Sequence, residues 1–135
     1  MSKIESKIGQ VDQSDEKIYT FLADFNNFKH LIPADKVKNW ESTENSCKFT
    51  VDGIGDAGLK IIEKTPYSLI KVTSEGKTPL SFFLWIQIKK IEESKSAIRI
   101  VIEPQVNPMM LAMVKGPLQK FLDMLVDQLG NLKIK

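Results

Sequence analysis

The feature that most constrains the fold is a long run of alternating apolar and polar residues between Val37 and Val106. A period of two residues is typical of β-strands that bury one face. Turn residues divide the run into strands expected at about 37–43, 46–53, 57–65, 68–75, 79–92 and 95–106. Every connection is too short for a helical crossover, so successive strands are predicted to pair antiparallel.

One more strand and two short helices are predicted before this run. Residues 3–8 alternate between charged side chains and Ile4, Ser6 and Ile8, as in a half-buried strand. Ser14 is a suitable N-cap for a helix with apolar residues at helical spacing. A second short helix is expected at Phe28–Ile32 and ends before Pro33. The sheet would then have seven strands, and sheets of that size twist and curl.

The last predicted element is a long C-terminal helix. Asn107 is a good N-cap, Pro108 suits the first helical position, and the helix should end near Gly130. Its apolar stripe needs a long concave partner, and the sheet is the only candidate. The fold class is therefore α+β: a curved antiparallel sheet of seven strands wraps the long helix, with two short helices between strands one and two. Residues 1–135 form a single domain, as the length also suggests.

Composition limits the location and the partners. The only cysteine, Cys47, excludes an internal disulfide and fits a reducing compartment. The charged N-terminus has no secretory signal pattern, and no run reaches the ~20 apolar residues that span a bilayer. We therefore expect a cytoplasmic protein without integral membrane contact. The net charge is +2, and Arg99 is the only arginine among 19 basic residues, which argues against binding to nucleic acid.

The order of these elements resembles that of the START-like helix-grip (SRPBCC) superfamily, over essentially the whole chain. Residues 14–33, with Phe21-Leu22-Ala23-Asp24-Phe25-Asn26-Asn27-Phe28 at their centre, are similar to the first-helix region of its polyketide cyclase/dehydrase and lipid-transport branch, which has many small bacterial members. The resemblance implies a cavity between sheet and helix. In that superfamily such cavities hold sterols, lipids, polyketides or plant hormones, and a minority of members catalyse reactions there.

The start of the long helix is rich in methionine. Met109, Met110 and Met113 are flexible and polarizable side chains that adapt to irregular apolar surfaces. Pro117 would kink the helix near Met113, and Gly116 would ease the bend. Two interpretations stay open: the segment lines a gated apolar pocket, or it is ordinary core filling around a kink.

Inward-facing apolar residues of the strands complete the predicted ligand site, together with a hydroxyl from Tyr67. The predicted ligand-binding residues are Met109, Met110, Met113, Phe82, Leu84, Ile86, Ile61, Ile100, Phe121 and Tyr67. On the opposite face of the same strand, Phe83 and Trp85 are unexpected aromatic residues. They lie either under another element or in a homodimer interface.

Other motifs give little indication of catalysis. Gly53–Gly58 matches a dinucleotide-binding pattern, but a strand rather than a helix should follow, which favours a glycine-rich hairpin. His30 is expected at the surface and Cys47 as a half-buried filler. Glu63 could act as an acid if it entered the pocket, whereas Arg99 and Glu103 are expected to pair at the surface. No catalytic set, cofactor or metal site is predicted.

The leading hypothesis is a noncatalytic carrier or sensor of a small hydrophobic molecule such as a lipid, a sterol-like or a polyketide-like compound. Two hypotheses compete with it. One is a polyketide cyclase- or dehydratase-type enzyme that steers its substrate by pocket shape, with one acid such as Glu63 or Tyr67. The other is a partner-binding or dimerising module with a filled core, acting through Phe83 and Trp85.

Overall fold

A computed structural model of the chain describes residues 3–30, 37–51, 55–76 and 81–131. The strands are β1 (Ile4–Glu5), β2 (Gly9–Val11), β3 (Val37–Ser42), β4 (Ser46–Val51), β5 (Gly55–Thr65), β6 (Leu69–Ser74), β7 (Phe82–Glu92) and β8 (Lys95–Pro104). The helices are α1 (Asp15–Leu22), the 3-10 helix η1 (Phe25–His30) and α2 (Pro108–Gly130).

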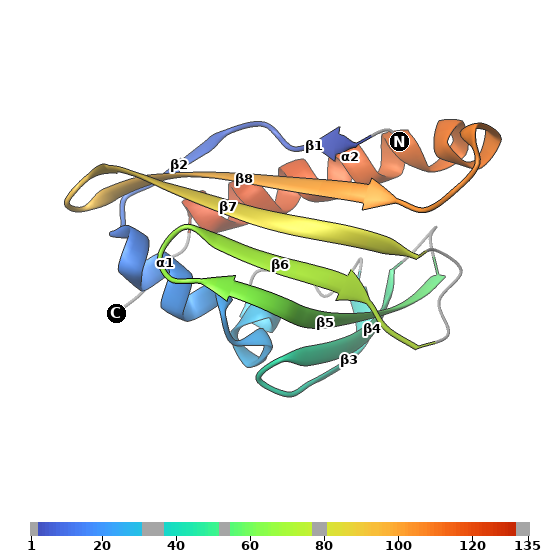
Figure 1. The fold of residues 1–135 in the computed structure, drawn as a ribbon, viewed down its shortest axis with the longest axis horizontal. Helices are drawn as coiled ribbons and strands as arrows, with labels where there is room; N and C mark the ends of the chain where they lie inside the picture. The colour runs from blue at the N-terminus through green and yellow to red at the C-terminus, as the bar shows by residue number, and fades with distance from the viewer. Residues whose placement is uncertain (1–2, 31–36, 52–54, 77–80, 132–135) are drawn as a thin grey trace.

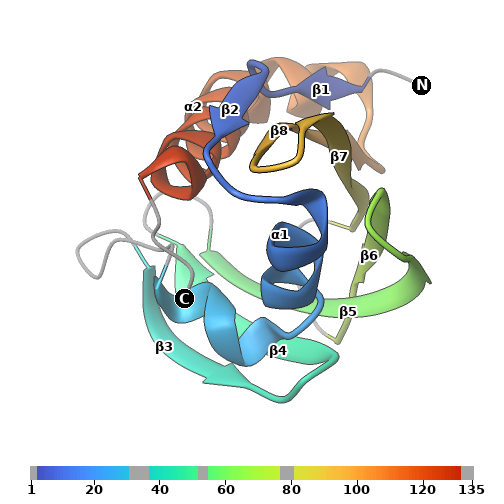
Figure 2. The same ribbon diagram turned by 90° about the vertical axis from the view of Figure 1, so that its left-hand side faces the viewer.

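The strands form one antiparallel sheet in the order β1-β8-β7-β6-β5-β4-β3, and β2 also pairs with β8. Helix α2 runs along the sheet beside β8 (Figure 1). Seen from the end, the sheet curls round from β8 to β3, with α1 and η1 at one mouth of the curve (Figure 2). The predicted α+β helix-grip architecture is therefore confirmed.

Both helix N-caps follow the prediction. The side chain of Ser14 accepts a hydrogen bond from the Lys17 amide at 3.2 Å, and that of Asn107 accepts one from the Met110 amide at 2.8 Å. Helix α2 continues through Pro117 to Gly130. The second short helix begins earlier than predicted, at Phe25, and residues 31–36 lie outside the described residues.

The first predicted strand is divided into β1 and β2. Between them the Ser6 hydroxyl accepts a hydrogen bond from the Ile100 amide at 2.9 Å and donates one to the Lys7 carbonyl at 2.8 Å. The Lys7 amide turns away from the sheet and donates to Asp123 of α2 at 2.8 Å. Because the backbone turns here, the alternation fails, and Ile8 is 68% exposed although the pattern placed it inward.

The pairing of the sheet shifts at three places: near the end of β7, between Lys90 and Glu92, and at one bulge each in β3 and β5. In β3 the residues Asn39 and Trp40 together oppose Phe49 alone, and Asn39 has a positive φ of 59°. In β5 the pairing slips between Ile61 and Glu63, which adds one residue to that strand. Each extra residue moves the following side chains to the other face of the sheet.

The core lies between the inner face of the sheet and the second half of α2. The helix residues buried there are Leu118, Leu122, Leu125, Val126 and Leu129. The first turns of α2 extend past the end of β8 (Figure 1), and Met109 and Met113 there are 77% and 73% exposed. Within the described residues, no helix is long and apolar enough to cross a membrane.

Candidate functional site

Two small apolar cavities lie between the sheet and α2. The first has a volume of about 60 Å³ and is lined by Phe49, Val51, Ala57, Leu59, Phe82, Leu84, Ile102, Leu118, Phe121 and Leu122. The second, of about 40 Å³, is lined by Phe25, Phe28, Trp40, Phe49, Leu59, Val72, Leu84, Ile86, Ile100, Phe121 and Leu125. Both are apolar because each strand contributes its inward-facing residues.

Four side chains line both cavities and therefore separate them: Phe49, Leu59, Leu84 and Phe121. They come from β4, β5, β7 and α2, so the partition is the place where sheet and helix meet. Phe121 is the only one of the four on the helix, and it is half-buried. A ligand that filled both cavities would have to displace one or more of these side chains.

Trp40 is the one described residue in either lining whose side chain carries a polar atom. Its ring stacks on Phe49, with centroids 5.4 Å apart and planes inclined by 23°. Its indole Nε1 is inaccessible to solvent and has no hydrogen-bond partner in the described part of the chain. A buried donor without an acceptor is unusual in a folded protein.

The β3 bulge places Trp40 on the inner face. In an unbroken strand with Val37 inward, Trp40 would face outward, because it is three positions further along the strand. The extra residue at Asn39 reverses this. Trp40 is not among the ligand-binding residues predicted from the sequence. The spacing of Val37 and Trp40 by three positions, with an asparagine before Trp40, indicates a bulge, because asparagine tolerates positive φ.

The structure brings together five of the ten predicted ligand-binding residues. Phe82 lines the first cavity, Ile86 and Ile100 line the second, and Leu84 and Phe121 line both. Ile61 is buried in the core, but it lies outside the described linings of the two cavities.

The other four predicted residues lie away from these cavities. Met109, Met110 and Met113 are exposed near the start of α2, so they do not fill the core. Tyr67 is 44% exposed and packs edge-on against Tyr19 of α1 at 5.7 Å. A ligand-binding role for these four residues stays a prediction.

The ionisable residues singled out from the sequence also lie outside the cavities. Glu63 is exposed and pairs across the sheet with Lys71, because the β5 bulge moves it off the face of Leu59 and Ile61. The Arg99 side chain donates from Nε to Gln87 at 2.8 Å and lies 3.7 Å from the Glu5 carboxylate, rather than pairing with Glu103 as expected. The side chain of His30 is outside the described part of the structure.

Cys47 is fully buried on β4 rather than half-buried. Burial raises the pKa of its thiol from 9.0 to about 12, and the nearby charge of Glu75 adds to this, while a backbone hydrogen bond with Leu59 opposes it. A thiol with a raised pKa is a poor nucleophile at neutral pH. Among the described residues, no group of histidine, cysteine, aspartate and glutamate could hold a metal ion.

Phe83 and Trp85 lie on the outer face of β7, half-buried, with ring centroids 6.3 Å apart. The Lys71 ammonium is 5.1 Å from the Phe83 ring centre and 5.5 Å from that of Trp85, and the Lys3 ammonium is 4.9 Å from Trp85. Lysine side chains thus cover part of this pair. The homodimer through Phe83 and Trp85 stays a prediction.

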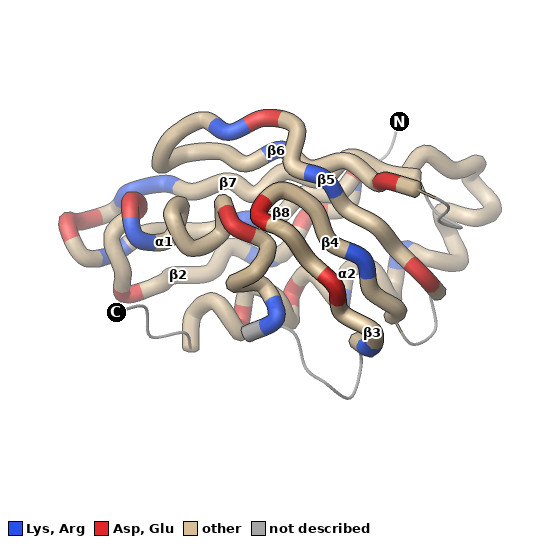
Figure 3. Tube along the Cα trace, turned by 90° about the horizontal axis from the view of Figure 1, so that it is seen from below, with Lys and Arg blue, Asp and Glu red and all other residues tan. Residues whose placement is uncertain are grey.

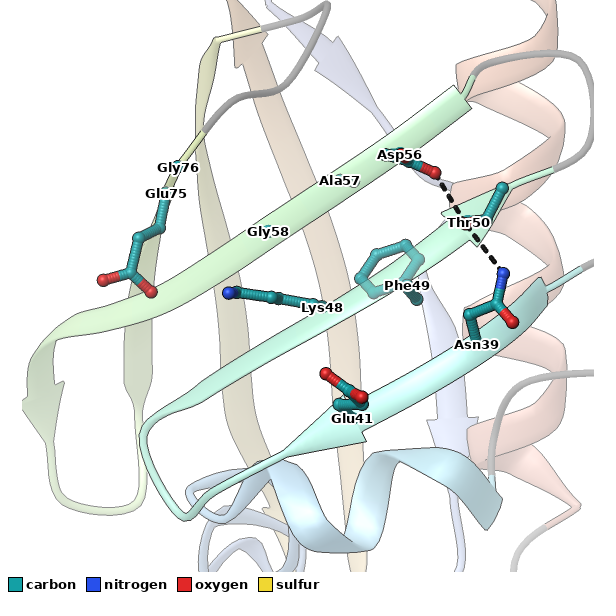
Figure 4. Close-up of a pocket in the computed structure, with 10 residues that line it drawn as sticks. All are labelled: Asn39, Glu41, Lys48, Phe49, Thr50, Asp56, Ala57, Gly58, Glu75 and Gly76. Carbon is teal, nitrogen blue, oxygen red and sulfur yellow. Dashed lines mark hydrogen bonds between the residues drawn. The ribbon is translucent and has the colours of Figure 1, made fainter.

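A wider hollow of about 430 Å³ lies on the outer face of β3, β4 and β5 (Figure 4). A chain of hydrogen bonds crosses it: Asn39 donates to Thr50 at 3.4 Å, and Thr50 donates to Asp56 at 2.7 Å. Lys48 and Glu41 line the same hollow. Acidic and basic residues are interspersed on this side of the molecule (Figure 3), as expected of a solvated surface. The hollow is open to solvent and carries charged side chains such as Lys48 and Glu41, so it does not enclose a hydrophobic ligand.

The Gly53–Gly58 motif does not open a helix. Residues Gly55–Thr65 form β5, and Gly55 has a positive φ of 112°. Gly58 lies so close to the backbone of Glu75 that a β-carbon there would be 2.4 Å from the Glu75 carbonyl oxygen. The described glycines of the motif therefore allow the conformation of β5 and its close approach to Glu75, rather than forming a phosphate site. Residues 52–54 lie outside the described ranges.

A curved sheet that grips a long C-terminal helix around an apolar cavity defines the START-like helix-grip fold, and this chain has it. Among solved structures, a START superfamily protein from Mycobacterium smegmatis matches with a TM-score of 0.76 and 14% identity, over 96% of this chain and 94% of that one. A truncated norcoclaurine synthase from Thalictrum flavum matches with a TM-score of 0.72 and 18% identity, over 98% of this chain and 95% of that one.

The di-domain ARO/CYC protein BexL of the BE-7585A biosynthetic pathway also matches, with a TM-score of 0.75 and 14% identity. The match covers 97% of this chain and 46% of BexL. No protein-family model matches the sequence. No curated protein matches it either. At these identities the likeness establishes the fold, so the function has to be argued from the cavity itself.

Proposed function

We propose that the protein binds a small hydrophobic molecule between the inner face of the sheet and helix α2, as a noncatalytic carrier or sensor. The observation that carries the proposal is the pair of adjoining cavities with almost wholly apolar linings. Apolar cavities of this kind stay dry and take up apolar molecules, because water gains no hydrogen bonds there. The free thiol of Cys47 supports a reducing, cytoplasmic location.

The small size of the cavities limits which ligands can bind without a movement of side chains. Pockets for drug-sized ligands have volumes of roughly 300–1,000 Å³, whereas these cavities hold about 60 and 40 Å³. The ligand is therefore compact, or its entry moves the partition formed by Phe49, Leu59, Leu84 and Phe121. Phe121 is the side chain best placed to move, because it is half-buried and sits on the helix rather than in the hydrogen-bonded sheet.

The lining favours binding over catalysis. A cyclase- or dehydratase-type enzyme would need polar groups that converge on its substrate. In the described linings, the Trp40 N–H is the only polar side-chain group, and an indole N–H neither gives up nor takes up a proton in ordinary acid–base chemistry. The two predicted acids, Glu63 and Tyr67, lie elsewhere.

The first test is native mass spectrometry of the protein as purified, combined with titration of the neutral probe N-phenyl-1-naphthylamine. We expect either a bound apolar molecule or saturable probe fluorescence with a micromolar dissociation constant. Phe121→Ala should tighten probe binding about tenfold, because it removes a side chain that divides the two cavities. A bare protein mass together with no saturable probe binding would refute the proposal.

A second variant tests whether the methionine segment takes part in binding, independently of the cavity. Met113 is 73% exposed and lines neither cavity, so Met113→Ala should leave the equilibrium affinity for the probe unchanged. If the segment borders the ligand entrance, as the sequence predicted, the variant changes the association and dissociation rates by the same factor in stopped-flow measurements. Unchanged rates would remove the methionines from the site and leave the cavity proposal intact.

A further inference from the structure

The two apolar cavities lie one behind the other along the strands. On β7 the first cavity is lined by Phe82 and Leu84 and the second by Leu84 and Ile86, so the second lies two residues further along. The antiparallel strand β8 shows the same step, from Ile102 in the first lining to Ile100 in the second. Two residues of a strand span about 7 Å, so the cavity centres are about 7 Å apart along the sheet.

Helix α2 shows the same order. Of the two cavities, Leu118 and Leu122 line the first alone, and Leu125 lines the second alone. Phe121 lies between them in the sequence and lines both. The cavities are therefore two parts of one elongated apolar space beside β7 and α2, and the partition of four side chains interrupts it.

One end of this space is closed by aromatic rings. Phe25 and Phe28 of η1 line the second cavity, are buried, and pack edge-to-face with ring centroids 4.8 Å apart. The other end lies at Leu118, the first buried residue of α2, and from there the earlier turns of the helix extend past the end of β8 (Figure 1). A ligand that lies along the space would therefore have its outer end at Leu118.

The linings restrict which part of a ligand can lie inside. No lysine, arginine, histidine, aspartate or glutamate is among the described residues that line either cavity. An ionised group there would lose its hydration without gaining a partner, which is strongly unfavourable. The space is also narrow, because its two parts hold only about 60 and 40 Å³. An unbranched hydrocarbon chain is apolar and has a small cross-section, so it suits this shape better than a fused ring system.

Phe121 is the side chain that can limit the length of such a chain. The other three members of the partition, Phe49, Leu59 and Leu84, belong to the sheet, whereas Phe121 belongs to the helix on the opposite side. Its removal would join the two cavities without altering the wall that the sheet forms.

We propose that this space binds one unbranched hydrocarbon chain, with its polar end at Leu118, and that Phe121 limits how far the chain enters. The inference rests on the proposed binding function and adds to it the class of ligand and the residue that sets its length. Bonds of ~1.5 Å advance an extended carbon chain by about 1.3 Å each, so the step of about 7 Å between the cavities corresponds to about five carbons.

The test uses straight-chain primary alcohols from 1-butanol to 1-dodecanol. Their dissociation constants are measured for the wild type and for Phe121→Ala by displacement of N-phenyl-1-naphthylamine. Each methylene group that enters the space should tighten binding about fourfold, whereas methylene groups left in water should add nothing. Affinity should therefore rise with chain length and then level off, and in Phe121→Ala it should level off about five carbons later than in the wild type.

Leu118→Ala is the matched control. It shortens another buried side chain of the same helix, but Leu118 lines only the first of the two cavities. The affinity should then level off at the same chain length as in the wild type. Phe121→Leu is a smaller change that should move this point by fewer carbons, and it replaces Phe121→Ala if far-UV circular dichroism shows that the alanine variant is unfolded.

A comparison of shapes in the wild type needs no variant. 1-Octanol and cyclooctanol have the same number of carbons, but only the first is a chain. We expect 1-octanol to bind more tightly by at least about tenfold beyond the difference in their partition from water into hexane, because a ring of that width overpacks the space.

The outcomes separate this inference from the binding proposal. Levelling off at the same chain length in the wild type and Phe121→Ala, equal corrected affinities for the two eight-carbon alcohols, or no displacement of the bound probe by any alcohol would overturn the inference and leave the binding proposal intact. A wild type that has a bare protein mass and does not bind the probe contradicts the binding proposal itself.

Discussion

Gly9 of β2 lies so close to Val126 of α2 that a β-carbon at position 9 would be 2.3 Å from the Val126 Cγ1 atom. Val126 is only 2% exposed, so it has little room to move. We expect Gly9→Ala to lower the free energy of unfolding by about 1–3 kcal/mol, as overpacking does elsewhere. Urea denaturation measures the change.

A double variant tests whether this contact is the cause. Val126→Ala removes the clashing methyl group, so Gly9→Ala in that background should cost at least about 1 kcal/mol less than in the wild type. Equal costs in the two backgrounds would mean that the destabilisation has another origin, such as the backbone conformation of β2.

The Ser6 hydroxyl takes the place of a backbone carbonyl as the acceptor of a hydrogen bond from β8. Ser6 is 6% exposed, and its hydroxyl accepts from the Ile100 amide at 2.9 Å. Ser6→Ala leaves that amide without its partner, so we expect a loss of about 1–3 kcal/mol in the free energy of unfolding and faster hydrogen exchange at Ile100. Ser94→Ala, at an exposed turn residue, is the control and should change stability by less than about 0.5 kcal/mol.

Cys47 should make stability fall at alkaline pH. Its pKa is raised from 9.0 to about 12 in the folded state, so the folded protein keeps the thiol proton that the unfolded chain loses. This contribution is fully present below pH 9 and is lost as the pH rises toward 12, with a slope of about 1.4 kcal/mol per pH unit. Denaturation of wild type and Cys47→Ala at several pH values isolates it, because the other groups titrate in both proteins. A constant difference between the two from pH 8 to 11 would contradict the prediction.

Shortening a side chain to alanine should have different effects in the two parts of α2. Leu122 is 1% exposed and lines a cavity, so Leu122→Ala should lower the free energy of unfolding by about 2–5 kcal/mol. Met113 is 73% exposed, and Met113→Ala should change it by less than about 0.5 kcal/mol. Comparable losses in the two variants would show that the methionine segment packs against the domain in solution.

The predicted homodimer through Phe83 and Trp85 is tested by sedimentation velocity. If the aromatic pair forms the interface, Trp85→Ser lowers the sedimentation coefficient at concentrations where the wild type is associated. Ile62→Ser, which removes an exposed apolar side chain outside this pair, should not. Identical coefficients for the wild type and Trp85→Ser at all concentrations exclude this interface.

The strands and helices could be predicted from the sequence wherever local residue patterns determine them. The alternation in β7 and β8 places Phe82, Leu84, Ile86 and Ile100 inward, and all four line the cavities. Ser14 and Asn107 identified both helix starts, because a cap is a local interaction between a side chain and the next turn. The antiparallel sheet around a long helix follows from these patterns and from the short connections.

Other features depended on contacts between segments far apart in the chain. The bulges at Asn39 and Ile62 change which face the next residues occupy, and so they place Trp40 in the cavity wall and Glu63 in solvent. The first strand breaks at Ser6 because Lys7 reaches Asp123, which is 116 residues away. The sequence alone determined the helix-grip fold, because strand periodicity and helix caps depend on residues that are close together in the chain. The tertiary structure alone decided which side chains enclose the cavity, since a one-residue shift in pairing reverses the face of everything that follows.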